Sequence, residues 1–459
     1  MVAAVDMIET IDPTTGEVLE RIALMDASQI DAKLDAAARC APRWQAASLD
    51  ERGKVLIAVA RVLRAQRDAL AAIAVREMGK PIVQARAELD KCAWALEYFA
   101  ENGAAMLAPQ EAASSAARSY VAFRPLGVIL AIMPWNFPYW QVLRAAAPAL
   151  TAGNTMVLKH AANTTRCALE LERVFAEAGA PEGLFGAIVA RGETMDRIVG
   201  DARIAGVTLT GSERAGAAVA RAAGEALKKC VLELGGSDPF VVFSDADLDA
   251  AAKTAVTARF QNNGESCIAA KRFIVEAGVY DEFVQRFAKV AGAQIVGNPM
   301  EDRVQLGPCA REDLRETVHA QVRATLEQGA KLICGGKPLE RAGFFYEPTV
   351  VAGVVPGMPM FDEEVFGPAA AVVRAGDRDQ ALALANASSF GLGSSLWTRD
   401  VAAAERFAAK VEAGAVFING MVASDPRLPF GGIKKSGYGR ELSAFGIHEF
   451  VNIQTVWIG

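Results

Sequence analysis

The sequence contains few of the residues on which several classes of protein depend. Histidine occurs only three times in 459 residues, so chemistry that needs a histidine base has few candidates. The seven cysteines include no C-x-x-C pair, which favours neither a disulfide framework nor a zinc site. We therefore expect no bound metal, and we expect the protein to be located in the reducing cytoplasm.

Basic charge and long apolar runs are also lacking. The net charge is −6, so we expect no surface that attracts nucleic acid or an anionic membrane. No apolar run approaches the roughly 20 residues that span a bilayer. Residues 1–17 lack the charged-then-apolar pattern of a signal peptide. With 52% hydrophobic and 22% charged residues, the composition is that of a soluble globular protein, and the length allows two or three domains.

The glycine signatures of the commonest nucleotide-binding loops are absent. No G-x-G-x-x-G follows an early strand, and no G-x-x-x-x-G-K-[ST] occurs anywhere. The segment LTGSERAG (209–216) nevertheless follows an expected strand and opens an expected helix. Its glycines and hydroxyl suit a phosphate held by backbone N–H groups and the helix dipole, although an ordinary helix N-cap has the same pattern.

The order of apolar patterns predicts an α/β fold. An early hairpin is followed by alanine-rich helices, and from residue 119 a long strand-like run leads to Trp135. Strands and helices then alternate in two blocks that meet near Glu233, which is typical of parallel sheets with ligands at the carboxyl ends of their strands. The hairpin and the first helices are expected over 8–22, 27–44, 48–79 and 81–103.

The last segment, EFVNIQTVWIG (449–459), has the pattern of an exposed strand with no partner close by in the sequence. An unpaired apolar edge strand favours aggregation unless another element covers it. We therefore predict that this strand pairs at an interface between subunits.

Cys267 lies in the polar segment QNNGESCIAA (261–270), directly before an expected strand. A structural cysteine usually lies within an apolar periodic run, where burial raises its pKa and makes it unreactive. This segment instead indicates a thiol presented on a turn. Taken alone, it allows either a catalytic nucleophile or a buried loop cysteine.

Six motifs in a fixed order resemble the aldehyde dehydrogenase family from about residue 8 to the last residue. They are PWNFP (134–138), the strand that ends in Lys159, LELGG (232–236), the cysteine loop, EEVFGP (363–368) and PFGG (429–432). The resemblance implies a Rossmann-like cofactor domain, an α/β catalytic domain and a β bridging arm for oligomerisation, in a homodimer or homotetramer. The expected ranges are 1–111 and 126–233 for the cofactor domain, 234–433 for the catalytic domain, and 112–125 and 434–459 for the arm.

The resemblance implies catalytic roles for Cys267, Asn136, Glu233 and Lys159. An aldehyde carbon is a poor hydride donor until a nucleophile adds to it, and the thiolate of Cys267 supplies that nucleophile. The Asn136 amide and the Cys267 backbone N–H match the oxyanion hole, and Glu233 matches the general base that activates water. Lys159 is a candidate to help activate the thiol. The presence of Glu233 argues against the CoA-acylating relatives, which lack this base.

The cofactor implied by the resemblance is NADP⁺ or NAD⁺. Strictly NAD-dependent members usually carry a glutamate three residues after the lysine that matches Lys159, and this chain has Ala162 there. The missing carboxylate removes the like-charge exclusion of a 2′-phosphate, so we expect both cofactors to be used and NADP⁺ to be favoured. The expected cofactor-binding residues are Trp135, Lys159, Ala162, Gly211, Ser212, Gly216, Leu234, Glu364 and Phe366.

The substrate implied by the resemblance is an aldehyde with a distal carboxylate. Arg144 lies eight residues after Asn136 and matches the arginine that binds this carboxylate in succinate-semialdehyde dehydrogenases. Some relatives have a second arginine where this chain has Gln261, so selectivity for chain length should be looser. The phrases NFPYWQVLRAAAPAL and SDPRLPFGGIKKSGYGRELS look like a bacterial branch of those enzymes. The expected substrate-binding residues are Arg144, Gln261, Ser424 and Phe430.

Three alternatives stay open on the sequence alone. The substrate could be glutarate semialdehyde or a plain aliphatic aldehyde. A cysteine esterase that uses Cys267 and Glu233 would hydrolyse activated esters and need no NAD(P)⁺. A non-catalytic binding protein on the same scaffold would not need Cys267, Asn136, Glu233 and Lys159 together. Their joint presence therefore argues against this alternative.

Overall fold

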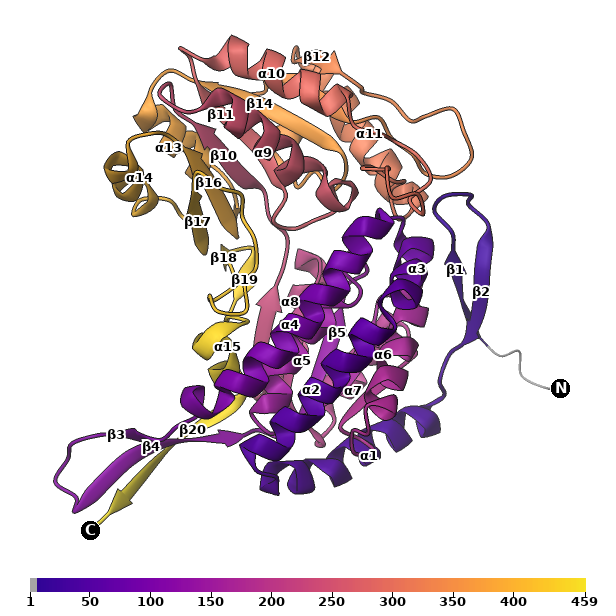
Figure 1. The fold of residues 1–459 in the computed structure, drawn as a ribbon, viewed down its shortest axis with the longest axis vertical. Coiled ribbons are helices and arrows are strands. Elements are labelled where there is room, and N and C mark those ends of the chain that lie inside the picture. The colour runs from indigo at the N-terminus through magenta and orange to yellow at the C-terminus, as the bar shows by residue number, and fades with distance from the viewer. Residues whose placement is uncertain (1–5) are drawn as a thin grey trace.

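The computed structural model describes residues 6–459 as two parallel sheets with helices packed on them and a small third sheet that extends from the body (Figure 1). Residues 1–5, which belong to the predicted cofactor domain and to the segment judged for a signal peptide, lie outside the described residues. The N-terminal hairpin is confirmed, since β1 (Met7–Ile11) pairs antiparallel with β2 (Val18–Ala23).

The first sheet has six strands in the order β19-β9-β8-β5-β6-β7. Five are parallel, and β19 adds one antiparallel strand from the segment predicted to belong to the arm. Alternation of strands with helices therefore gives the predicted parallel sheet. The strands are β5 (Val128–Met133), β6 (Thr155–His160), β7 (Phe185–Ile188), β8 (Ile204–Thr210), β9 (Lys229–Glu233) and β19 (Gly437–Tyr438).

Helices cover both faces of this sheet. α2 (Leu49–Ala65), α4 (Ile82–Met106) and α5 (Trp140–Thr151) share one core with β5 and β6. The other face packs on α1, α7 and α8. The prediction of one long helix over 48–79 is wrong in one respect. The segment forms two helices, α2 and α3, which Gln66 separates with φ −104° and ψ 13°. The remaining helices here are α1 (Ala27–Ala46), α3 (Arg67–Met78), α6 (Thr165–Glu177), α7 (Met195–Gly200) and α8 (Glu213–Glu225).

The strand-like run expected from residue 119 to Trp135 is two strands in different sheets. β4 (Arg118–Pro125) ends before Gly127, whose φ of +134° turns the chain into β5. The Asn154 side-chain oxygen accepts the backbone N–H of Leu126 at 2.8 Å and that of Gly127 at 3.0 Å. These bonds hold the turn, which the continuous apolar pattern did not reveal.

The second sheet has seven strands in the order β12-β13-β14-β11-β10-β16-β17, all parallel except β12. The Cys267 loop leads directly into β11, near the centre of this sheet. Its strands are β10 (Asp238–Val242), β11 (Ala270–Glu276), β12 (Lys331–Cys334), β13 (Thr349–Ala352), β14 (Ala369–Ala375), β16 (Gly393–Trp397) and β17 (Ala415–Ile418). Its helices are α9 (Leu248–Phe260), α10 (Tyr280–Gly292), α11 (Glu312–Glu327), α12 (Pro359–Asp362), α13 (Arg378–Asn386) and α14 (Val401–Ala408).

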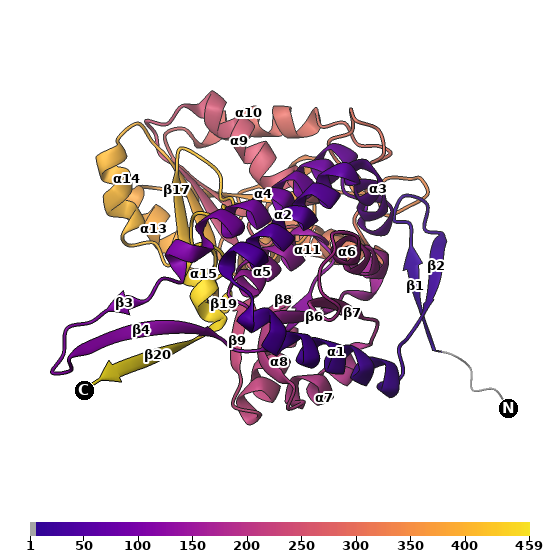
Figure 2. The ribbon, with the colours of Figure 1, turned by 60° about the horizontal axis from the view of Figure 1, so that its bottom comes forward.

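The third sheet forms the predicted arm, which extends away from the body (Figure 2). β20 (Val451–Ile458) pairs antiparallel with β4 over its whole length, and β3 (Gln110–Glu111) lies on the other side of β4. One edge of β20 therefore has its partner within the chain, in the other segment of the predicted arm, and the pairing at an interface between subunits stays a prediction for the opposite edge. Ile453 and Trp457 of β20 remain 60% and 58% exposed.

Within the described residues, no helix combines the length and the apolar character that crossing a membrane requires. The last helix, α15 (Ser443–Glu449), precedes β20, and a small two-stranded sheet is formed by β15 (Phe390–Gly391) and β18 (Ile433–Lys434).

Candidate active site

The loop before Cys267 is held in an unusual backbone conformation. Asn262, Asn263 and Gly264 have φ values of 53°, 59° and 74°, the left-handed region that asparagine and glycine tolerate best. The Asn262 side chain donates to the carbonyls of Asn136 and Glu265, both at 2.9 Å. The Asn263 side chain donates at 2.9 and 2.8 Å to two carbonyls of neighbouring segments. These bonds fix the loop against the turn that carries Asn136.

Two buried basic side chains, Lys271 and Arg259, stabilise the loop by donating hydrogen bonds to its backbone carbonyls. Lys271 donates to the backbone carbonyls of Ser266 and Cys267, both at 2.9 Å. Arg259 on α9 donates to the carbonyl of Gly264 at 2.7 Å and to that of Ala270 at 3.1 Å. Neither residue was predicted from the sequence. For Lys271, the available signal was a charge inside a buried element, since all seven residues of β11 are buried.

Asn136 lies just after β5, with its side chain 3% exposed. Its Nδ2 donates one hydrogen bond to the backbone carbonyl of Glu265 at 3.1 Å. An amide nitrogen carries two hydrogens, so the second stays available for a ligand oxygen. The bond to Glu265 thus orients the amide and leaves a donor beside the cysteine loop.

Glu233 lies at the carboxyl end of β9 and is 2% exposed. Neither of its side-chain oxygens has a hydrogen-bond partner among the described residues. Burial, and then the neighbouring charge of Glu441, raise the pKa of Glu233 well above its ordinary value, while Arg144 opposes the shift. Burial also raises the pKa of Glu441. The free protein therefore disfavours the ionised form of Glu233.

The pKa of the Cys267 thiol is raised in the free protein. Burial raises its pKa to about 12, and the positive charges of Arg144 and Lys271 offset only part of this shift. The negative charges of Glu364 and Glu233 raise the pKa further. Lys159, predicted to help activate the thiol, is not among the charges that act most on it. The reactive thiolate must therefore form when the cofactor or the substrate binds.

The two glycines of LELGG, Gly235 and Gly236, allow this motif to contact the cysteine loop and Glu364. A Cβ at Gly236 would lie 2.5 Å from the carbonyl oxygen of Cys267, and a Cβ at Gly235 would lie 2.7 Å from Oε2 of Glu364. The N–H of Gly236 donates to Oε1 of Glu364 at 2.9 Å. Only glycine permits this approach, so the end of β9, the cysteine loop and Glu364 lie in direct contact.

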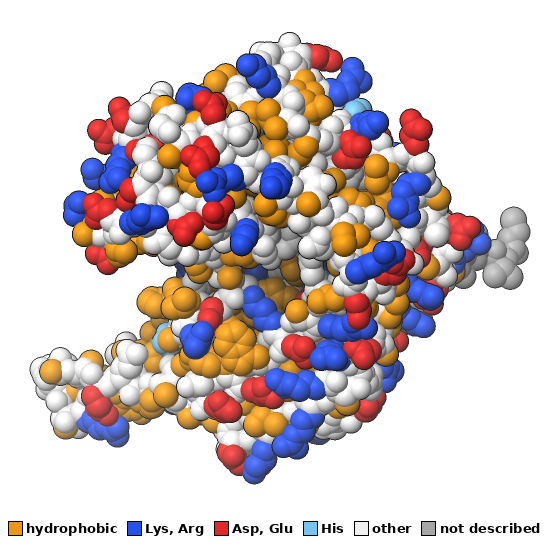
Figure 3. All heavy atoms as spheres, turned by 45° about the horizontal axis from the view of Figure 1, so that its top comes forward, with side chains coloured by type: hydrophobic (Ala, Val, Ile, Leu, Met, Phe, Trp, Pro, Cys, Tyr) orange, Lys and Arg blue, Asp and Glu red, His pale blue; other side chains and the backbone are white. Residues whose placement is uncertain are grey.

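Cys267 opens into a cavity of about 350 Å³ between the two large sheets. All four predicted substrate residues, Arg144, Gln261, Ser424 and Phe430, line this cavity together with Cys267. A space-filling view shows the molecule hollowed between its two halves (Figure 3). The remaining lining is mainly apolar and aromatic, with Phe137, Trp140, Ile268, Met421 and Val422 among its residues.

Arg144 faces this cavity but is also engaged inside the protein. Its Nε forms an ion pair with Glu441, and both side chains are almost fully buried. Its Nη2 donates to Oγ1 of Thr210 at 3.3 Å, and its guanidinium lies 4.5 Å from the centre of the Phe430 ring. Its role in binding a substrate carboxylate stays a prediction. Glu441 was not predicted from the sequence, because its partner Arg144 lies far from it along the chain.

Several of the predicted cofactor-binding residues contact one another. Ser212 caps α8, accepting the N–H of Ala215 at 3.3 Å, and lines a second cavity of about 390 Å³ together with Glu364. A Cβ at Gly216 would lie 2.6 Å from Leu234, so these two also touch. The rings of Trp135 and Phe366 meet edge to face at 5.7 Å. Gly211 precedes Ser212 in the same turn.

Lys159 is the residue before the last of β6, and its partly buried amine forms no hydrogen bond or ion pair to any residue from 6 to 459. Burial lowers its pKa. Ala162 is exposed in the turn that follows. The Lys159 ammonium near the end of β6 and the α8 N-terminus after β8 lie on either side of β5 in the sheet, and they fit the anionic phosphates and the ribose of a dinucleotide.

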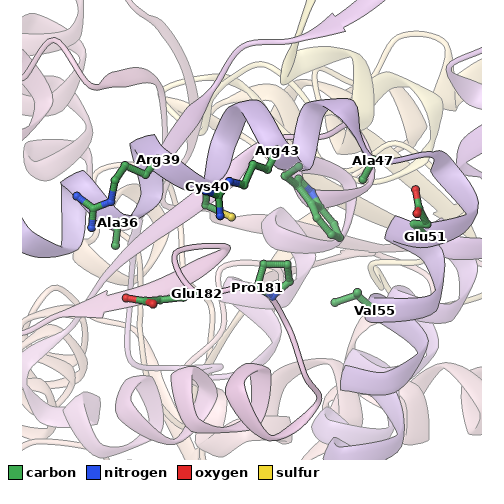
Figure 4. A pocket seen from close by; sticks show the side chains of 10 residues that line it. Ala36, Arg39, Cys40, Arg43, Ala47, Glu51, Val55, Pro181 and Glu182 are labelled. Atoms are coloured by element: carbon green, nitrogen blue, oxygen red, sulfur yellow. The ribbon is translucent and has the colours of Figure 1, made fainter.

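A further cavity, of about 460 Å³, lies beside α1 and is lined by residues that include Arg39, Cys40, Arg43 and Glu182 (Figure 4). None of the predicted catalytic, cofactor or substrate residues lines it. Burial raises the pKa of Cys40, and no oxyanion donor of the kind provided by Asn136 accompanies it among the residues that line the cavity. The chemistry predicted from the sequence therefore concentrates at the Cys267 cavity.

Comparison with known proteins agrees with this geometry. The model of the aldehyde dehydrogenase family matches residues 2–456. A succinate semialdehyde dehydrogenase [NAD(P)⁺], Sad, of Escherichia coli (strain K12) is 50% identical over 448 residues, which are 98% of this chain and 97% of the relative. Succinate-semialdehyde dehydrogenase [NADP(+)] 1 of Mycobacterium bovis (strain BCG / Pasteur 1173P2) is 50% identical over 454 residues, 98% of this chain and 99% of that relative.

Solved structures share the fold. The crystal structure of succinic semialdehyde dehydrogenase from Streptococcus pyogenes in complex with NADP⁺ has a TM-score of 0.96 and 38% identity, and the match covers 98% of this chain and 99% of that one. The predicted α/β fold with a Rossmann-like part, a catalytic part and a β arm is confirmed. The chain is an aldehyde dehydrogenase and belongs to the aldehyde dehydrogenase family.

Proposed function

We propose that the protein oxidises succinate semialdehyde to succinate with NADP⁺ or NAD⁺. The observation that carries the proposal is the cavity in which Cys267 and the four predicted substrate residues meet. The 50% identity to enzymes named for this substrate supports it.

In the first half of the reaction, Sγ of Cys267 adds to the aldehyde carbon and gives a tetrahedral thiohemiacetal. The Asn136 amide and the Cys267 backbone N–H stabilise the oxyanion of this adduct. Because the thiol has a raised pKa in the free protein, its proton must pass to solvent as the adduct forms. Collapse of the adduct leaves a thioester on Cys267, and the hydride that it expels would pass to a nicotinamide held beside the cysteine loop.

In the second half, Glu233 activates the water that hydrolyses the thioester. Its carboxyl is buried and free of hydrogen bonds, so it is able to accept a proton once it is ionised. Arg144 favours the ionised form, and Glu441 opposes it. Succinate is then released and Cys267 is free again.

The cofactor is held by residues of both parts. Ser212, Gly211 and the first turn of α8 suit the pyrophosphate, and Lys159 suits the adenosine ribose. Glu364 and Phe366 lie toward the nicotinamide end, beside the cysteine loop. We assign 1–111 and 126–233 to the cofactor domain, 234–433 to the catalytic domain, and 112–125 and 434–459 to the arm. The two sheets support this division, although β19 adds residues 437–438 to the first sheet.

We also propose that the protein forms a homodimer or homotetramer in the cytoplasm. The free edge of β20, with Ile453 and Trp457 exposed, supports pairing with a second copy.

The proposed function is tested with purified protein, a panel of aldehydes and each cofactor in turn, by following the absorbance of reduced nicotinamide. We expect kcat/KM to be highest for succinate semialdehyde. A higher value for glutarate semialdehyde or for an aliphatic aldehyde would identify one of those as the substrate. Ester hydrolysis without any oxidation would replace the dehydrogenase by a cysteine esterase.

Replacing Ala162 with glutamate should shift cofactor preference toward NAD⁺. A carboxylate near the adenosine ribose repels a 2′-phosphate, and an interaction of about 1–2 kcal/mol corresponds to about a 5- to 30-fold lower kcat/KM for NADP⁺. The kcat/KM for NAD⁺ should stay the same or rise. Ala162→Gln is the matched control, since it adds the same bulk without charge. Equal loss of NADP⁺ activity in both variants would contradict the electrostatic explanation.

A further inference from the structure

The cavity beside Cys267 contains a positive charge that no residue from 6 to 459 balances with an ion pair. Three charged side chains line it: Glu88 and Lys91 of α4 and Arg144 of α5. Glu88 is neutralised by an ion pair with the buried Lys80, and its other oxygen accepts two backbone N–H groups at 2.8 Å. Arg144 is neutralised by Glu441. Lys91 is the remaining charge.

Lys91 forms no ion pair with any described residue. Its amine donates to Oγ of Ser424 at 2.8 Å and lies 4.4 Å from the centre of the Trp140 ring. Asp425 is next in sequence to Ser424, but its carboxylate is bound by Arg427 at 2.6 Å. An ammonium group carries three hydrogens, so Lys91 keeps donors for a ligand after its bond to Ser424.

Ser424, like Lys91, keeps a hydrogen-bond donor available for a ligand. Its Oγ accepts from Lys91 and also from Nε1 of Trp140 at 3.1 Å. Because both bonds use the oxygen as an acceptor, the hydroxyl hydrogen remains free to donate. A carboxylate beside Lys91 and Ser424 would therefore meet a charged donor and a neutral donor on an aromatic wall, which is a favourable arrangement for an anion in a partly buried site.

We propose that Lys91, together with Ser424, binds the distal carboxylate of the substrate and determines specificity for aldehydes that carry one. The inference rests on the proposed function and adds to it the residue that recognises the charge. Arg144 faces the same cavity, but its Nε already pairs with the buried Glu441, so a substrate carboxylate would have to share the charge of Arg144 with Glu441. Arg144 therefore acts mainly to hold Glu441, and Lys91 supplies the unmatched charge.

Burial supports this assignment. Desolvation, and then repulsion from Arg144, lower the pKa of Lys91 to about 8. An ammonium that is destabilised in the free protein gains most when an anion binds next to it, because the anion offsets both effects.

Lys91→Met should separate charged from uncharged substrates. Loss of a hydrogen bond between charged groups is worth about 1.5–3 kcal/mol, so KM for succinate semialdehyde should rise about 10- to 100-fold while kcat changes little. Butanal, which has the same number of carbons and no carboxylate, should keep its KM and kcat. Lys91→Arg should recover part of the affinity for the semialdehyde. Lys289→Met, at an exposed lysine on α10, is the control for a lost lysine elsewhere.

Two different failures are distinguishable in this experiment. If the wild-type protein does not prefer succinate semialdehyde to butanal, the proposed function is wrong, whatever Lys91 does. If the wild type shows that preference and Lys91→Met weakens both substrates equally, the assignment of Lys91 is overturned.

The pH dependence of the wild-type protein gives a second test that needs no variant. The ratio of kcat/KM for succinate semialdehyde to that for butanal should fall as pH rises through about 8, because Lys91 loses its charge there. Titration of Cys267 and Glu233 affects both substrates and cancels in the ratio. The other groups that act on Lys91 are Arg144, Cys92, Glu88 and Asp425; burial keeps Cys92 a thiol, and Arg427 keeps Asp425 ionised. A ratio that is independent of pH would overturn the proposal.

Discussion

Cys267→Ala should abolish aldehyde oxidation, with kcat lowered by at least about 10⁴-fold, the scale seen when an enzyme loses its nucleophile. Without Sγ, no thiohemiacetal forms, and the unmodified aldehyde carbon is a poor hydride donor. The measurement is the initial rate of nicotinamide reduction with succinate semialdehyde. The mass of the intact protein during turnover should show an acyl adduct on the wild type and none on the variant.

Cys334→Ala is the matched control for this variant. Cys334 is a partly buried free cysteine in β12, away from the Cys267 cavity, and its loss should leave the rate of oxidation nearly unchanged. The variant and the control should bind the cofactor as the wild type does. Substantial oxidation by Cys267→Ala would remove the covalent mechanism, and loss of ester hydrolysis alone would favour the cysteine esterase.

Glu233→Gln should stop the reaction after its first half. The amide keeps the shape of the carboxyl but cannot accept a proton from water, so hydrolysis of the thioester should slow about 10²- to 10⁴-fold. Rapid mixing should show a burst of about one reduced nicotinamide per active site, followed by a very slow steady state. In the wild type, the hydrolytic step should accelerate as pH rises, because the raised pKa of Glu233 keeps it protonated at low pH.

Glu327→Gln, at the exposed end of α11, is the control for a lost carboxylate. It should show full turnover at every pH. A Glu233→Gln variant that turns over steadily, with no burst, would assign the activation of water to another group. A variant that shows neither burst nor turnover would instead mean that Glu233 acts before the thioester forms.

The general architecture was predictable because it depends on local patterns. The alternation of apolar strands with amphipathic helices predicts two parallel sheets, and the capping box of Ser48 and Glu51 marks the start of α2 where the structure has it. The polar segment around Cys267 predicted a turn, and the structure has three left-handed residues there. Motif order then placed Glu233, Asn136 and Cys267 in the same family framework.

The contacts that decide specificity were not predictable, because they join residues far apart in the sequence. Arg144 pairs with Glu441, and Lys91 meets Ser424, across 297 and 333 positions respectively. The spacing of Arg144 from Asn136 correctly places it toward the cavity but does not reveal its internal partner. No local pattern predicts the pairing of β20 with β4, although the resemblance placed both segments in one arm, and the apolar run across Gly127 concealed a change of sheet.

The unpartnered carboxyl of Glu233 also bears on how stable the folded protein is. In the unfolded chain Glu233 and Glu441 are hydrated and titrate near their ordinary pKa values, whereas burial raises both in the folded protein. The folded state therefore retains protons that the unfolded chain releases, and the free energy of unfolding falls as pH rises through the interval between these values. Catalysis at neutral pH thus requires ionised groups at a place where ionisation weakens the fold, and neutral replacements at this site are expected to stabilise the protein while they remove its activity.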